Sequence, residues 1–80
     1  MKLTKEQIEQ IIKALENPNT RLIIEFDQHE EYVTNNGTQF CISDGFGNVN
    51  KYPKRKFIEH LFSIYDWVNI ELVTETRIKL

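Results

Sequence analysis

The last thirteen residues carry the clearest pattern in the chain. From Val68 to Leu80, apolar side chains recur at even positions, while charged and polar side chains occupy most odd positions. A period of two residues is typical of a β-strand with one buried face and one exposed face. The segment 68–80 is therefore predicted to form one long strand, or two strands with a bulge near residues 73–75.

A second long strand is predicted over residues 20–34, because Leu22, Ile24 and Phe26 also alternate. The apolar signal fades at residues 28–31, which indicates either a bulge or a turn. The two long strands match in length, and we expect them to pair with each other.

Two turns should follow the second long strand. Asn36-Gly37 is a strong hairpin signal, because both central residues of a type I′ turn need positive φ. Residues 38–43 are predicted to form the return strand. The glycine-rich segment 44–48 indicates another turn, after which residues 49–52 form a short third strand.

Helical spacing appears in two segments. In residues 4–16, Thr4 is a good N-cap and Gln7 completes a capping-box pattern. The apolar positions of this helix are Ile8, Ile11, Ile12 and Leu15. A second helix is predicted to begin at Pro53, a residue favoured at the first helical position. Its apolar stripe comprises Phe57, Ile58, Leu61, Phe62 and Tyr65.

These elements predict a single α+β domain over residues 1–80, in the order α-β-β-(β)-α-β. Each helix has one apolar stripe and each strand has one apolar face. The simplest packing is an antiparallel sheet of three to four strands with two helices on one face. The opposite face of the sheet would be exposed to solvent or used for binding.

Composition excludes several classes of protein. The formal net charge of −2 is far from that of a strongly basic nucleic-acid coat or a highly acidic DNA mimic. A lone cysteine, Cys41, cannot form an internal disulfide. The charged N-terminus is unlike a signal peptide, and the apolar runs are too short to span a membrane. We therefore expect a cytoplasmic domain.

Catalysis has little support in the sequence. The glycines lack the spacing of a dinucleotide site or a P-loop, and His29 and His60 have no obvious nucleophile to activate. Glu25, Asp27, His29 and Glu31 share one strand face, but strand spacing holds them too far apart to converge on one ion. We expect no enzyme activity, no metal and no cofactor.

A protein-binding module is the favoured function. A glycine turn exposes Phe46, and aromatic side chains are enriched at binding hot spots. The predicted protein-binding residues are Phe46, Tyr52, Lys54, Arg55, Asp27, Glu30 and Glu31. Amino acids with AT-rich codons predominate, so a phage or mobile-element protein that inhibits or modulates a host protein is predicted, as an antagonist of host defence. A homodimer through strand 68–80 is a further prediction.

The alternative function is nucleic-acid binding. Lys51, Lys54, Arg55 and Lys56 gather around the start of the second helix, where free backbone N–H groups also attract anions. A helix, a β-meander and a second helix that begins with lysines resemble, over residues 4–66, a double-stranded RNA-binding domain. Gly45, Gly47 and the three lysines carry the resemblance, which implies that these lysines contact phosphates.

Overall fold

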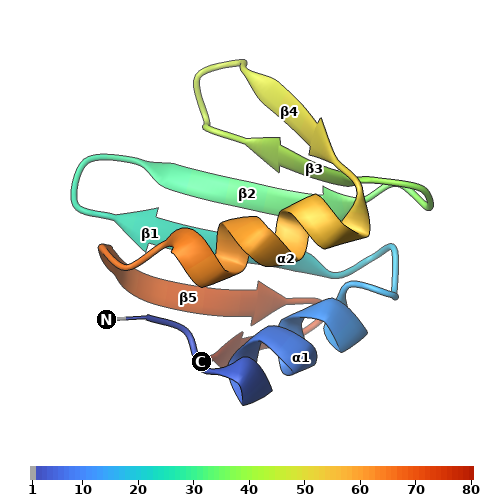
Figure 1. The fold of residues 1–80 in the computed structure, drawn as a ribbon, viewed down its shortest axis with the longest axis horizontal. Helices are drawn as coiled ribbons and strands as arrows, with labels where there is room; N and C mark the ends of the chain where they lie inside the picture. Colours follow the sequence, from blue (N-terminus) through green and yellow to red (C-terminus); the bar gives the residue numbers. More distant parts are fainter. Residues whose placement is uncertain (1) are drawn as a thin grey trace.

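A computed structural model describes residues 2–80. Eight elements follow one another along the chain (Figure 1). They are α1 (Lys5–Ala14), β1 (Arg21–Phe26), β2 (Glu30–Asn35), β3 (Phe40–Ser43), β4 (Val49–Tyr52), α2 (Lys54–Ser63), β5 (Trp67–Val73) and β6 (Arg77–Lys79).

The strands form one antiparallel sheet in the order β4-β3-β2-β1-β5-β6. Both helices cover the same face of this sheet, and the other face carries no helix (Figure 1). The predicted α+β class and the placement of the helices are confirmed. The predicted strand count was too low, because residues 2–80 form six strands.

The two extra strands arise because each long strand folds into a hairpin. Segment 20–34 turns after Phe26, whose backbone N–H donates to the carbonyl of His29 at 2.8 Å. Segment 68–80 turns at Thr74, whose N–H donates to the carbonyl of Thr76 at 3.0 Å. Polar residues occupy both turns, and neither turn contains the glycine or proline that usually marks one. The expected pairing of the two segments is present between β1 and β5.

The hairpin at Asn36-Gly37 forms, but with a different turn. Only Gly37 has positive φ, at 102°, so the turn is not type I′. The N–H of Asn36 donates to the carbonyl of Gln39 at 3.0 Å, which closes a longer loop. The Asn36 side-chain oxygen also accepts from the N–H groups of Thr38 and Gln39, and it replaces the backbone contacts of a tighter turn.

The helices begin differently. At α1 the capping box is present: the Thr4 hydroxyl accepts from the Gln7 N–H, and the Gln7 side chain accepts from the Thr4 N–H. At α2 Pro53 is the N-cap, so the helix begins at Lys54, one residue later than predicted, and no side chain caps it. Within the part of the chain that the structure describes, no helix is long and apolar enough to cross a membrane.

The core lies between the helices and one face of the sheet. Phe57 of α2 is fully buried and stacks on Phe40 of β3, with ring centroids 4.4 Å apart. Around this pair pack the apolar side chains that alternation and helical spacing predicted. They include Ile8, Ile11, Leu15, Leu22, Ile24, Ile42, Leu61, Ile70 and Leu72, and Val33 of β2 joins them in the core.

Candidate functional site

The predicted protein-binding residues do not form one surface. Asp27, Glu30 and Phe46 lie at the end of the sheet where β1 and β3 finish. Lys54 and Arg55 begin α2 at the opposite end, because β4 runs the length of the sheet before the helix starts (Figure 1). The structure therefore separates these residues into two groups, an aromatic and acidic group at one end of the sheet and a basic group at the other.

At the first end, the loop that carries Phe46 is well ordered by hydrogen bonds. The Asp44 carboxylate accepts from the N–H of Phe46 at 2.8 Å and from the side-chain amide of Asn48, also at 2.8 Å. The Asn48 and Phe46 contacts lower the pKa of Asp44 below its ordinary value. The loop thus keeps the Phe46 side chain exposed to solvent, and 78% of the residue's surface is accessible.

Two of the predicted residues, Glu31 and Tyr52, contact α2. Glu31 faces the helices, and its carboxylate lies 3.0 Å from Nε2 of His60 on α2. Tyr52 stacks on the same imidazole, with ring centroids 6.0 Å apart. Glu31 and Tyr52 therefore join α2 to the sheet through His60, and both side chains are only partly exposed. Glu30 accepts instead from the Tyr32 hydroxyl at 2.6 Å, which raises the pKa of Tyr32.

The predicted cations differ in their partners. Arg55 and Lys56 both approach Glu59 of α2, at 3.5 and 3.7 Å. Among residues 2–80, Lys54 has no carboxylate partner within salt-bridge distance. Lys51 pairs with Cys41 in the sheet, which places its side chain on the face away from the helices. Lys51 and Lys54 are therefore the cations of this group without an ion pair among residues 2–80, and Lys54 is the one that lines a hollow on the helical side.

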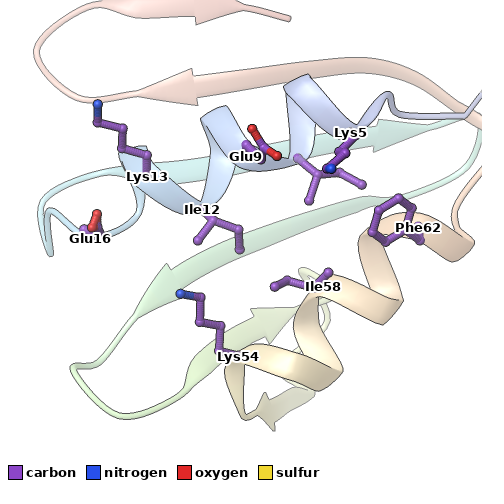
Figure 2. Close-up of a pocket in the computed structure, with 9 residues that line it drawn as sticks. Lys5, Glu9, Ile12, Lys13, Glu16, Lys54, Ile58 and Phe62 are labelled. Carbon is purple, nitrogen blue, oxygen red and sulfur yellow. The ribbon is translucent and has the colours of Figure 1, made fainter.

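A groove between α1 and α2, absent from the sequence predictions, is an apolar hollow on the helical side of the sheet. Figure 2 shows Ile12, Ile58 and Phe62 along its length, with Lys54 at one end. The groove has a volume of about 500 Å³, and Lys5, Glu9, Lys13 and Glu16 line its α1 side. Phe62 is 48% exposed although it belongs to the predicted apolar stripe. About half of the Phe62 side chain is therefore open to solvent beside the groove.

Two other hollows adjoin this groove. One, of about 510 Å³, is lined by α2 residues that include Ile58 and Phe62, and the other, of about 200 Å³, reaches Phe40 and the β2–β3 loop. Lys54 lines all three hollows. The sequence signal that could have located the groove is the width of the α2 stripe. Phe57 and Leu61 are fully buried and Ile58 packs partly against the core, so Phe62 at the edge of the stripe is left half-exposed.

Within the described residues, no three His, Cys, Asp or Glu side chains converge as a metal centre requires. His29 stacks on Phe26 with centroids 4.5 Å apart, and His60 is engaged by Glu31. Comparison of the chain with protein-family models, curated proteins and solved structures finds no match.

Proposed function

We propose that this chain is a non-enzymatic protein-binding module and that the groove between α1 and α2 is its binding site. The observation that supports this proposal is the open apolar floor of the groove. Phe62 is 48% exposed, and the partly buried side chains of Ile58 and Ile12 line the same groove. Exposed apolar patches with a polar rim are typical of interaction sites.

The occupant we propose is an amphipathic, acidic segment of another protein. Each helix is ten residues long, about 15 Å, so the groove accommodates about three turns of a helical partner. Apolar side chains spaced by three and four residues would pack on Ile12, Ile58 and Phe62. A carboxylate on the same segment would meet Lys54, which has no partner of its own, in a charge-assisted hydrogen bond.

The source of that partner rests on composition alone. The preference for AT-rich codons supports a phage or mobile-element origin, and a small domain without a catalytic centre acts through its surface. We therefore retain the proposal that the partner is a host protein and that binding inhibits or modulates it.

Fluorescence anisotropy tests the groove directly. The probe is a labelled peptide of about three helical turns, with leucines on one face and glutamates on the other. We expect saturable binding that the Lys54→Glu variant weakens by about tenfold. Lys79→Glu is the matched control, because it makes the same charge change on β6, away from the groove. Equal binding by the two variants, or no binding by the wild type, would refute this function.

One observation favours the alternative, nucleic-acid binding. On the face without helices, one row of side chains runs across the strands. It contains Lys51, Cys41 and Thr34 on β4, β3 and β2, and Val73 and Arg77 on β5 and β6. Arg21, which is paired with Val73, lies in the same row. These cations lie at the end of the sheet where α2 begins with Lys54, Arg55 and Lys56.

Nucleic-acid binding has its own test. Labelled duplex RNA and DNA would bind at low salt and dissociate as salt is added, because phosphate contacts release counterions. Lys51→Glu/Arg21→Glu should abolish this binding and leave binding of the acidic peptide unchanged. Duplexes that fail to bind even at low salt would exclude the alternative.

A further inference from the structure

The two edges of the sheet differ in what they expose. β6 is three residues long, and Arg77 and Lys79 occupy two of its positions. Cations on an edge strand discourage pairing with another chain. β4 has four residues with a single cation, Lys51, and Val49 beside it is 56% exposed. The β4 edge is therefore the less protected of the two.

The hydrogen-bonding pattern shows which groups of β4 are free. The N–H of Asp44 donates to the carbonyl of Asn48 at 3.2 Å, so these two residues form a hydrogen-bonded pair. Such pairs alternate along an antiparallel ladder, which makes Ile42 and Asn50 the next one. The N–H and C=O groups of Val49 and Lys51 consequently point away from β3, and no strand lies beyond β4 (Figure 1).

We propose that β4 pairs with β4 of a second copy of this chain, antiparallel, about a two-fold axis through Asn50. In this register Val49 of each copy lies opposite Lys51 of the other. The free N–H and C=O groups of both residues are then satisfied. Val49 and Lys51 share the face without helices, so the Lys51 stem covers the exposed Val49 side chain.

Charge favours the antiparallel arrangement. The loops at one end of the sheet, residues 27–29, 44–48 and 64–66, contain Asp27, Asp44 and Asp66 and no lysine or arginine. The first turn of α2 at the other end contains three cations and no acidic residue. A two-fold axis across the strands places the acidic end of each copy beside the basic end of the other.

The same arrangement gives Phe46 a partner. Phe46 lies three residues before Val49, and Lys54 lies three residues after Lys51. The two-fold axis therefore brings the Phe46 loop of one copy to Pro53 and Lys54 of the other. The dimer goes beyond the proposed function, since the groove lies between the helices and the pairing edge is β4. A dimer would present two grooves.

Sedimentation equilibrium of the full chain tests the dimer without any peptide, so its outcome is independent of the groove. We expect the mean mass to rise from 9.5 kDa toward twice that value between micromolar and millimolar concentrations. Lys51→Pro removes one outward N–H and should weaken association by about tenfold. Lys79→Pro is matched to it, because it removes a lysine and an outward N–H from the β6 edge, and it should have no effect.

A cross-link decides the register even if the proline variants fail to fold. Asn50 faces itself across the axis in a pair without hydrogen bonds, where Cα atoms lie close enough for a disulfide. With Cys41→Ser, the Asn50→Cys variant should form a covalent dimer under mild oxidation, and Ile78→Cys on β6 should not. A monomeric wild type at millimolar concentration, or cross-linking of Ile78→Cys in preference to Asn50→Cys, would overturn the proposal.

Discussion

The two helices lie side by side on the same sheet face, but they differ in how much of their stability is local. α1 has a complete capping box, an acidic residue in its first turn and Lys13 in its last turn. These features complement the helix dipole and its free N–H groups. α2 has no side-chain cap, and its first turn contains Lys54, Arg55 and Lys56, which oppose the same dipole.

This difference indicates that the sequence of α2 meets a requirement other than the stability of the fold. α2 is held by Phe57 and Leu61 in the core and by the contact of His60 with Glu31. Its unfavourable residues, Lys54 at the start and the exposed Phe62 near the end, both line the groove. Local choices that oppose the fold are expected at functional sites. The groove should therefore depend on α2 more than on α1.

The largest expected effect contrasts two phenylalanines of α2. Phe57→Ala removes a fully buried ring that stacks on Phe40, and it should lower the free energy of unfolding by about 3–5 kcal/mol. Phe62→Ser removes a half-exposed ring and should cost less than about 1 kcal/mol, but it should weaken peptide binding. Urea denaturation measures both. Similar losses of stability would show that Phe62 is a core residue and that the groove is not an open site.

The next effect concerns the cap that only α1 has. Thr4→Ala removes the hydroxyl that accepts from the Gln7 N–H and should destabilise the protein by about 1 kcal/mol. Thermal unfolding followed by circular dichroism measures the change. Thr38→Ala in the β2–β3 loop is a control that removes a threonine hydroxyl without removing a helix cap. If the two variants lose equal stability, the capping box is not what stabilises α1.

A charge reversal at each helix should give effects of opposite sign. Lys54→Glu relieves repulsion at the α2 N-terminus and should raise the free energy of unfolding by about 0.3–1 kcal/mol. Lys13→Glu places an anion in the last turn of α1 and should lower it by a similar amount. Denaturation at low ionic strength measures both. Loss of stability in Lys54→Glu would contradict the interpretation of α2.

The smallest effect lies on the sheet face that neither helix covers. The Asn69 amide and the Arg77 guanidinium lie 3.2 and 2.9 Å from the Glu71 carboxylate, and they lower its pKa below the ordinary value of 4.5. A lowered pKa in the folded state stabilises the protein above pH 4.5. That stability is lost as the pH falls through the folded-state value. Glu71→Gln should therefore unfold with a shallower dependence on acid, whereas a curve that matches the wild type would exclude this role.

Helices and strands could be predicted from the sequence where the spacing of apolar residues, or a capping residue and its partner nearby in the chain, marks them. Thr4 and Gln7 specify the start of α1, and alternation identified Leu22, Ile24, Ile70 and Leu72 as inward-facing. A turn was one of the two alternatives predicted for residues 28–31, whereas two strands with a bulge, not a turn, were the alternative near residues 73–75. Neither alternative could be chosen from the sequence, because backbone hydrogen bonds close both turns without glycine or proline.

The site was less predictable than the fold. Lys54 was a candidate on charge alone, but its lack of an ion-pair partner depends on the distance to Glu59, which Arg55 and Lys56 approach. Phe62 has the spacing of a core residue, but it is 48% exposed in the structure. Phe46 and Lys54 are eight residues apart in sequence, but the length of β4 separates them in space.

The most direct test of the groove is an NMR titration of ¹⁵N-labelled protein with the acidic amphipathic peptide. The shifts should concentrate on Ile12, Lys54, Ile58 and Phe62, on the two facing sides of α1 and α2. A peptide with lysine in place of every glutamate should leave the spectrum unchanged. Shifts that centre on Lys51, Arg21 and Arg77 on the opposite face of the sheet, or no shifts at millimolar peptide, would contradict the proposal that the groove is the binding site.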